Sequence, residues 1–346
     1  MSGSDAPVLR HDVTTNDWVL YAPARAERPN AFVTGQTRVV DAAVTCPFCP
    51  GNEHLTPTEV ARASDATGGW RVRVVPNKYP AFDRSIASGP VAITPVFHEM
   101  GGYGVHEVVV EAPEHTTRLS ELSSDHVEAL LGVLHGRFVA LSREPRVRSV
   151  ILFKNHGRAA GCSLSHPHWQ IAATPVVPRL LRTRHAIATE YFDLTAKNLY
   201  AALLEAELDA KVRVLDANEA FVAFLPFASQ LPYQVRIQPR VPRASFAAAD
   251  EAGFRPLATL LRDVLRRLDG ALGDPAFNLT VNTVAVGDED EPYFAWHIDV
   301  LPRLTTPAGF ELGSGMSINP VLPETAAAAL AAVELDRGSV QVSRGG

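Results

Sequence analysis

The sequence contains an internal repeat at a spacing of 127 residues, which constrains the fold more than any other feature. A strand-like segment at 106–111 corresponds to 233–238, and a helix-like segment at 123–143 corresponds to 250–270. The apolar positions keep their register, so the strand and helix periods are preserved in both copies. We therefore predict a duplicated α+β fold, built from two mostly antiparallel sheets with packed helices.

The first copy contains the sequence His-Pro-His-Trp-Gln at residues 166–170, after a loop with glycine and serine. Side chains alternate along a strand, so His166, His168 and Gln170 would project from one face. A neutral imidazole attacks phosphorus readily and leaves well once protonated, which makes His168 the predicted nucleophile. The amide of Gln170 and the hydroxyl of Ser163 are suited to hydrogen-bond phosphate oxygens. The alternative is a polar strand with incidental histidines.

The two copies differ at these histidines. At the 127-residue spacing, Tyr293 replaces His166 and Ala295 replaces His168. A histidine pair needed for folding would be expected in both copies, so its loss indicates that the first copy holds the active site and the second serves as scaffold. We predict a first half with the metal site and the nucleophile and a degenerate second half, at residues 1–178 and 179–346.

Two of the three cysteines are spaced as Cys46-x-x-Cys49, which is half of a tetrahedral zinc site. The sequence has no second pair of this kind, so we predict His115 and His166 as the remaining ligands. A redox pair and two buried thiols are the alternatives, although the surrounding loop signals argue against a thioredoxin-like site. We expect a structural Zn²⁺ with four protein ligands. The third cysteine, Cys162, is predicted to be a small filler rather than a catalyst.

The composition excludes several classes of protein. With a net charge of −6, the chain lacks the excess of basic residues typical of a general nucleic-acid binder. No apolar run approaches the roughly 18 residues of a membrane span. Three cysteines and an N-terminus without a signal pattern predict a cytoplasmic protein.

Six short motifs resemble those of the galactose-1-phosphate uridylyltransferase family, which belongs to the histidine-triad superfamily. They are spread over nearly the whole first half and are specific in combination, at residues 25–29, 46–52, 76–80, 113–115, 161–163 and 166–170. The resemblance extends over most of the chain and implies a duplicated histidine-triad-like fold. It also implies a homodimer whose active sites take residues from both subunits.

The resemblance also implies a role for individual residues. His168 would carry the nucleotide, and Gln170 and Ser163 would contact phosphate. The implied zinc ligands are Cys46, Cys49, His115 and His166. The implied substrate-binding residues are Arg25, Arg28, Asn77, Asn155, Gly161, Cys162 and Phe310.

Two segments depart from the family pattern. The uridylyltransferases hold the hexose with Lys-Phe and a later Tyr-Glu, whereas residues 309–315 retain only Phe310. This segment, continuing to Pro320, looks more like the ADP-glucose phosphorylase branch. Some relatives have a second-half His-x-His that contributes to an additional metal site, and here the sequence is His297-Ile298-Asp299, so the sequence does not support a second metal.

The leading functional hypothesis is a nucleotidyltransferase that works by ping-pong transfer through His168. An NDP-sugar would donate a nucleoside monophosphate, and a sugar 1-phosphate would accept it, as in the UDP-glucose–hexose-1-phosphate uridylyltransferases. The enzymatic alternative is an ADP-sugar phosphorylase that uses phosphate as the acceptor. The alternative from a different class is a non-catalytic zinc-stabilised protein that binds nucleotides.

Overall fold

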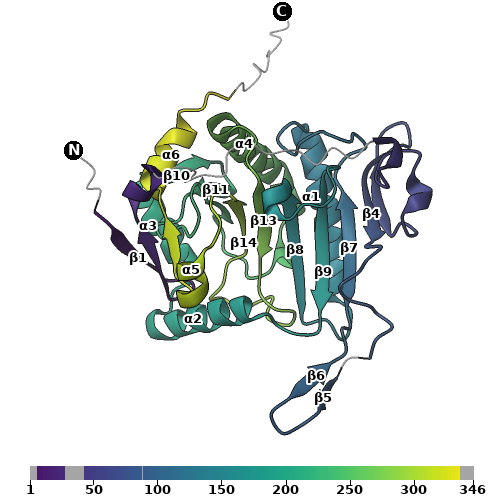
Figure 1. Cartoon of the computed structure of the whole chain (residues 1–346), viewed down its shortest axis with the longest axis horizontal. Coiled ribbons are helices and arrows are strands. Elements are labelled where there is room, and N and C mark those ends of the chain that lie inside the picture. The colour runs from purple at the N-terminus through teal and green to yellow at the C-terminus, as the bar shows by residue number, and fades with distance from the viewer. Residues whose placement is uncertain (1–5, 28–42, 88, 336–346) are drawn as a thin grey trace, which may run out of the picture.

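The structure is a computed structural model that describes residues 6–27, 43–87 and 89–335 of the chain, and Figure 1 shows its elements. Its centre is a ten-stranded sheet in which every neighbouring pair is antiparallel. The strand order is β10-β11-β12-β14-β13-β8-β9-β7-β4-β3. The first half contributes β3 (Ala61–Ser64), β4 (Trp70–Pro76), β7 (Val105–Val110), β8 (Ser149–His156) and β9 (His168–Thr174). The second half contributes β10 (Val214–Ala217), β11 (Phe221–Phe224), β12 (Val235–Pro239), β13 (Phe277–Asn282) and β14 (His297–Pro302).

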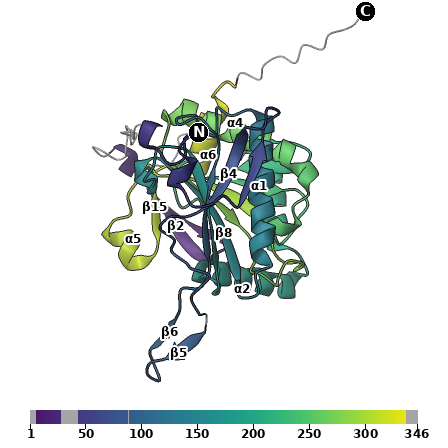
Figure 2. The ribbon, with the colours of Figure 1, turned by 90° about the vertical axis from the view of Figure 1, so that its right-hand side faces the viewer.

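Two long helices, α1 (Ser124–Ser142) and α4 (Phe254–Leu272), lie side by side on one face of this sheet (Figures 1 and 2). The side chain of Ser123 caps α1 by accepting a hydrogen bond from the His126 N–H, and Gly273 ends α4 with a φ of +70°. Apolar side chains at helical spacing on α1 and α4 pack against the sheet in one core that spans both halves. The short helix α6 (Pro323–Ala331) packs beside α4.

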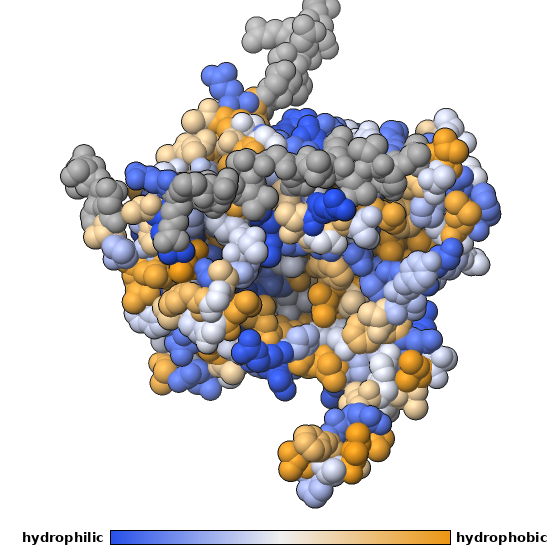
Figure 3. Space-filling view, viewed as in Figure 1, coloured by the Kyte–Doolittle hydropathy of each residue, from blue (hydrophilic) through white to orange (hydrophobic). Residues whose placement is uncertain are grey.

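The other face of the sheet carries the remaining elements, which pack mainly on the second half (Figure 2). These are α2 (Arg179–Thr195), α3 (Leu199–Ala210), α5 (Gly309–Ser314) and a small sheet of β1 (Val8–Asp12), β2 (Asp17–Tyr21) and β15 (Ser317–Asn319). In the small sheet β2 pairs with β15 in parallel. A separate hairpin of β5 (Pro90–Ala92) and β6 (His98–Met100) projects away from the body of the molecule. The face opposite α1 and α4 is hollowed near its middle, as Figure 3 shows.

The short 3-10 helices mark turns between these elements. Two of them flank the predicted site, namely η2 (Ala43–Thr45) and η4 (Arg158–Ala160). The others are η1 (Pro23–Glu27), η3 (Glu53–Leu55), η5 (Phe246–Ala248) and η6 (Glu251–Gly253). In the part of the chain that the structure describes, no helix combines the length and apolarity required to cross a lipid bilayer.

The predicted α+β class with antiparallel strands is confirmed. The five strands of each half follow the same spatial order, and the two sets that we expected as separate sheets are joined into one because β8 pairs with β13. In that pair Phe153 lies opposite Thr280, the residue 127 positions later. A local pseudo-two-fold axis therefore passes between these two residues, as expected for a duplicated unit.

The gapless register predicted for the repeat is wrong in two strands, by one residue in β12 and by two residues in β14. Lys154 pairs with Trp169, so the next step along the two strands sets Asn155 opposite His168. In the second half Asn282, the counterpart of Asn155, pairs with His297. His297 and not Ala295 therefore occupies the position of His168. The shift in β14 arises because the connection at residues 283–296 is longer than the one at residues 157–167.

Candidate active site and metal centre

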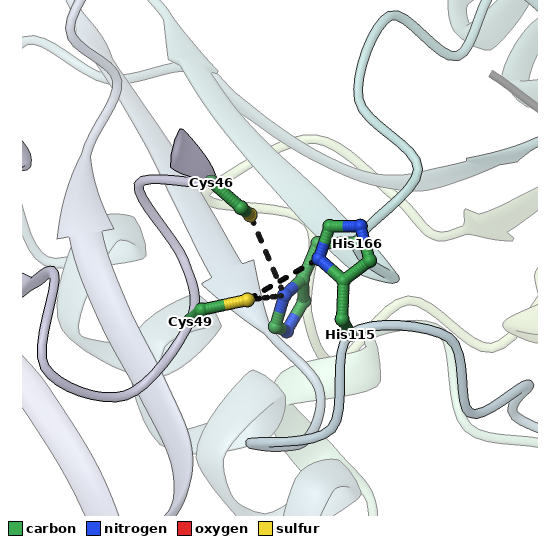
Figure 4. A group of neighbouring side chains, drawn as sticks. All are labelled: Cys46, Cys49, His115 and His166. Atoms are coloured by element: carbon green, nitrogen blue, oxygen red, sulfur yellow. Dashed lines mark hydrogen bonds between the residues drawn. The ribbon is translucent and has the colours of Figure 1, made fainter. Parts of the chain in front are cut away.

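The four residues predicted as metal ligands lie together at one end of the first half. Figure 4 shows the four side chains pointing toward one another from three separate loops. Their ligand atoms all lie within 4.8 Å of one another. The Cys49 Sγ lies 3.2 Å from the Nδ1 of His115, and both cysteine sulfurs lie 3.6 Å from the Nδ1 of His166. A tetrahedral zinc with ordinary Zn–S and Zn–N bonds separates its sulfur and nitrogen ligands by roughly 3.5 Å. The group therefore fits this metal.

The outer nitrogens of the two histidines are also held. The Nε2–H of His166 donates to the carbonyl of Ala112 at 2.8 Å, and the His115 Nε2 lies 3.0 Å from the Ser165 Oγ. Such outer contacts fix which ring nitrogen faces a metal. Each Nδ1 faces the cysteine sulfurs and each Nε2 is engaged elsewhere, so both histidines are oriented as ligands.

His168 begins β9 and its side chain is only 7% exposed. Its Nδ1–H donates to the backbone carbonyl of His166 at 2.9 Å, which leaves the lone pair on Nε2. Burial lowers the pKa of His168 to about 4, with the hydrogen bond to the His166 carbonyl opposing and the Lys154 charge adding to the effect. The ring of Phe48 packs 5.5 Å from the His168 ring. The imidazole is therefore neutral, fixed in rotation and presents one free nitrogen.

The sheet register sets further polar groups on the same face as His168. Gln170 lies two residues along β9, opposite Val108 of β7. Its Oε1 lies 2.9 Å from the Nε2 of His106. Asn155 lies beside His168 on β8, and its Oδ1 accepts a hydrogen bond from the Nδ2 of Asn278 at 2.9 Å. This contact uses the Oδ1 of Asn155, so its NH₂ group is the part of the amide that can donate to a substrate.

The loop between β8 and β9 contains the predicted phosphate contacts Gly161, Cys162 and Ser163. Gly161 ends η4 with a φ of +84°, a conformation that favours glycine. The N–H groups of Gly161 and Cys162 donate to the carbonyls of Arg158 and Gly157 within the loop. These two N–H groups are therefore engaged internally, whereas the Ser163 side chain is exposed.

The other predicted substrate residues are divided between the two ends of the molecule. Asn77 follows β4, and its Nδ2 lies 3.3 Å from the His106 Nε2, so it borders the same face as Gln170. Arg25 lies in η1, directly after the small sheet, and Phe310 lies in α5 and is 47% exposed. Figure 1 shows the small sheet and α5 at the second-half end, away from β4 and β7. Arg28 lies outside the described residues.

Three residues near the site were missed by the sequence interpretation. Lys154 and Glu111 form a buried ion pair, with the Lys154 Nζ 2.5 Å from the Glu111 Oε1. Each of the two charged residues lies among apolar neighbours on a predicted strand, a pattern that indicates burial. Since buried charges are rare unless paired, this pattern could have predicted the ion pair. The third is His106, whose ring contacts Asn77 and Gln170. No local pattern distinguishes it, because its partners come from two distant segments.

The equivalent position in the second half is closed. His297 is fully buried, and its ring lies 5.2 Å from the Tyr200 ring of α3. Asp299, at the place of Gln170, accepts two hydrogen bonds from Arg236, at 2.8 and 3.1 Å. Ala295 stands at the place of the ligand His166. The second half therefore keeps a histidine but has neither access to it nor the corresponding metal ligand.

Two cavities accompany these sites. One of about 260 Å³ is bordered by the 157–165 loop, Asn155, Lys154 and His115. The other, of about 520 Å³, lies over the second half between α2, the β1–β2 turn and the sheet. Neither His168 nor any of the four clustered ligands is among the described residues that line this larger cavity. His168 is not among the described residues that line the smaller cavity either, but that cavity borders Asn155, its neighbour across the sheet, and the candidate ligand His115.

Comparisons with known proteins agree on one family. Residues 3–178 match the model of the galactose-1-phosphate uridyl transferase N-terminal domain. An ADP-glucose phosphorylase of Arabidopsis thaliana is 33% identical over 336 residues, which cover 96% of this chain and 94% of the relative. A galactose-1-phosphate uridylyltransferase of Thermotoga maritima is 26% identical over 95% of this chain and 99% of the relative.

Solved structures give the same result. The crystal structure of an ADP-glucose phosphorylase from Arabidopsis thaliana with bound ADP-glucose matches with a TM-score of 0.82 at 33% identity. The match covers 95% of this chain and all of the other. A uridylyltransferase structure at 24% identity has the same fold, with a TM-score of 0.74 over 94% of this chain. The family predicted from the six motifs is confirmed, and the chain belongs to the galactose-1-phosphate uridylyltransferase family.

Proposed function

We propose that this protein is a nucleotidyltransferase in which His168 carries a nucleoside monophosphate between two substrates. The observation that carries the proposal is the hydrogen bond from the His168 Nδ1–H to the carbonyl of His166. It leaves Nε2 as a nucleophile with no proton to remove. Asn155 and Gln170, on the same sheet face, supply hydrogen-bond donors for the phosphoryl oxygens.

The reaction has two steps. In the first, the Nε2 lone pair of His168 attacks the α-phosphorus of an NDP-sugar and forms a P–N bond. The bond from that phosphorus to the bridging oxygen breaks, and the sugar 1-phosphate leaves with the electron pair. In the second, an oxygen of the acceptor phosphate attacks the same phosphorus, and the P–N electrons return to Nε2. The His166 carbonyl stabilises the positive charge that the ring carries in between.

The proposed role of zinc is structural. Cys46, Cys49, His115 and His166 would occupy all four positions of a tetrahedral ion, leaving none for substrate. When bound, the ion would supply folding free energy. Because His166 is both a ligand and the residue whose carbonyl holds His168, the metal would also fix the position of the nucleophile.

The similarity to the ADP-glucose phosphorylase and the second-half segment at 309–315 favour an ADP-sugar as the donor and inorganic phosphate as the acceptor. The ADP-glucose phosphorylase is more similar to this chain than the uridylyltransferase of Thermotoga maritima, at 33% against 26% identity. Residues 309–315 also lack the lysine and the tyrosine–glutamate pair with which the uridylyltransferases hold a hexose. We therefore expect weaker discrimination among hexoses than in a site that has these hydrogen-bonding groups.

We propose that the protein works as a homodimer. Arg25 and Phe310 lie at the second-half end of the molecule, so they would complete the His168 site of a second subunit. Figure 3 shows apolar side chains gathered on the β5–β6 hairpin, which support an interface. Phe97, between the two strands, is 67% exposed. The proposed assembly is cytoplasmic and binds neither nucleic acid nor membranes.

Labelling with nucleotide sugars tests the proposal. The protein is incubated with ADP-glucose or UDP-glucose labelled at the α-phosphate, and the acid-labile label on the protein is measured. We expect rapid labelling from ADP-glucose and its release as ADP when phosphate is added. Release by galactose 1-phosphate from a UMP-labelled protein would instead support the uridylyltransferase hypothesis. Binding without any covalent label would indicate a non-catalytic nucleotide-binding protein.

A further inference from the structure

The ring of His106 connects the loop after β4 to the side chain of Gln170. His106 is the second residue of β7, and across the β7–β9 ladder it lies diagonally to Gln170 on the same face. Its Nδ1 lies 3.1 Å from the backbone nitrogen of Ala81, and its Nε2 lies 2.9 Å from the Gln170 Oε1. Both nitrogens of this half-buried ring are therefore within hydrogen-bond distance of a partner.

The Ala81 contact determines where the ring proton lies. A backbone N–H is always a donor and cannot be reversed, so the His106 Nδ1 must accept from it. The Nε2 then carries the proton, because a neutral imidazole has one donor nitrogen and one acceptor nitrogen. The only acceptor that Gln170 offers to this N–H is its Oε1, at 2.9 Å. One backbone group thus fixes the tautomer of His106 and the orientation of the Gln170 amide.

Asn77 is the remaining polar neighbour of the ring. Its Oδ1 accepts from the Tyr79 N–H at 2.9 Å, which turns its Nδ2 toward the His106 Nε2 at 3.3 Å. Two donors face each other there, so this is a van der Waals contact and not a hydrogen bond. The backbone N–H of Asn77 also donates to the carbonyl of His106 at 2.8 Å. The contacts of Asn77 therefore leave the assignment of the ring proton unchanged.

We propose that His106 is a positioning residue that holds Gln170 with its NH₂ group toward the phosphoryl group transferred through His168. With Oε1 engaged by His106, the amide can offer only its two N–H donors to a substrate. In the reversed orientation the carbonyl oxygen of Gln170 would face the phosphoryl oxygens and repel them. This inference rests on the proposed function for its catalytic consequence, whereas the tautomer of His106 can be measured without any activity.

The first test is the tautomer itself. Long-range ¹H–¹⁵N correlation spectra of protein labelled at histidine distinguish protonation at Nδ1 from protonation at Nε2, and the signal that disappears in His106→Phe assigns the residue. We expect the Nε2–H form in the wild type and in Gln170→Ala. A ring protonated at Nδ1, or at both nitrogens, would overturn the proposal. If the ring is protonated at Nε2 but no NDP-sugar labels the protein, the orientation of Gln170 stands and the proposed function is refuted.

The second test is a double-mutant cycle on the rate of His168 labelling. His106→Phe keeps an aromatic ring and removes the donor, and we expect it to slow labelling about 10- to 100-fold. Substrate affinity should change much less. His106→Gln places an amide N–H near the original Nε2 and should recover a large part of the rate. In a Gln170→Ala background, His106→Phe should slow labelling less than about twofold, because the side chain that His106 positions is already absent.

A structural role would give a different pattern. If His106 acted only by holding the 77–81 loop through Ala81, His106→Phe would be as costly in Gln170→Ala as in the wild type. That additive result would overturn the proposal, as would a His106→Gln variant no faster than His106→Phe. Circular dichroism and metal content of each variant show whether the fold and the metal cluster are intact.

Discussion

His168 and His297 are held in the same way in the two halves of the molecule. The Nδ1–H of His168 donates to the carbonyl of His166 at 2.9 Å, and that of His297 donates to the carbonyl of Ala295 at 3.0 Å. The duplicated strand therefore imposes one imidazole orientation wherever it carries a histidine at this position. The difference lies in the surroundings, because α3 covers His297 whereas His168 borders the predicted substrate face.

This relationship predicts which of the two histidines reacts. His168→Gly should abolish nucleotide labelling and lower turnover by at least about 10⁴-fold, since it removes the nucleophile itself. His297→Asn is the matched control and should retain labelling per folded molecule. Mass spectrometry of the labelled peptide gives the site directly. Label on a folded His168→Gly protein would contradict the covalent mechanism.

The metal cluster predicts a loss of stability when one ligand is changed. Cys46→Ser should lose most of its bound zinc and unfold at a lower temperature, because metal binding contributes directly to folding free energy. Cys162→Ser is the control, since Cys162 lies outside the cluster and its thiol donates to the carbonyl of Leu164. Elemental analysis and thermal unfolding measure both effects. Equal zinc content in the two variants would refute the ligand assignment.

The buried pair of Arg236 and Asp299 predicts a strong effect in the second half. Asp299→Asn should lower the free energy of unfolding by about 3 kcal/mol, because it leaves the Arg236 charge without its counter-ion. Urea unfolding at neutral pH measures the loss. A change of less than 0.5 kcal/mol, about what a surface substitution gives, would show that the pair does not hold the closed site together.

The same pair predicts the pH dependence of that loss. Burial, the largest single influence, would raise the pKa of Asp299, but the neighbouring charges and hydrogen bonds, those of Arg236 first, together outweigh it, and the pKa lies well below its usual value. A carboxyl group whose pKa is lower in the folded than in the unfolded state stabilises the fold at pH values above its unfolded pKa of about 4. This contribution disappears as the pH falls through the folded pKa. The difference between wild type and Asp299→Asn should thus be constant above pH 5 and shrink in stronger acid.

Local patterns in the sequence were sufficient for the fold class and for the grouping of Cys46, Cys49, His115 and His166, whereas the role of His168 stays a prediction. Alternation in residues 166–170 predicts that His168 and Gln170 share a face, and the Cys-x-x-Cys spacing predicts half of the cluster. Strand register was not predictable in the same way. A few extra residues in the β13–β14 connection leave the apolar pattern almost unchanged, so the sequence alone equated His168 with Ala295 and not with His297.

Contacts between distant segments were the other limit. The role inferred for His106 depends on the N–H of Ala81, in a loop that precedes it by 25 residues, and no periodicity encodes that approach. Arg25 and Phe310 belong to motifs of the family, but a motif does not state in which subunit a side chain acts. Only the fold shows that both residues lie at the second-half end, which suggests that they act in the site of the partner subunit.

Subunit mixing provides a test of that arrangement. Two variants are prepared, His168→Gly and the double variant Arg25→Ala/Phe310→Ala, each expected to be nearly inactive as a homodimer. If Arg25 and Phe310 act in the partner's site, a mixed dimer has one site with an intact His168 and intact partner residues. Random exchange makes half of all dimers mixed, so about one quarter of the sites, and of the wild-type activity, should return. Light scattering confirms the dimer, and mixing with unmutated protein controls for exchange. If exchanged dimers recover no activity, Arg25 and Phe310 do not act across the interface.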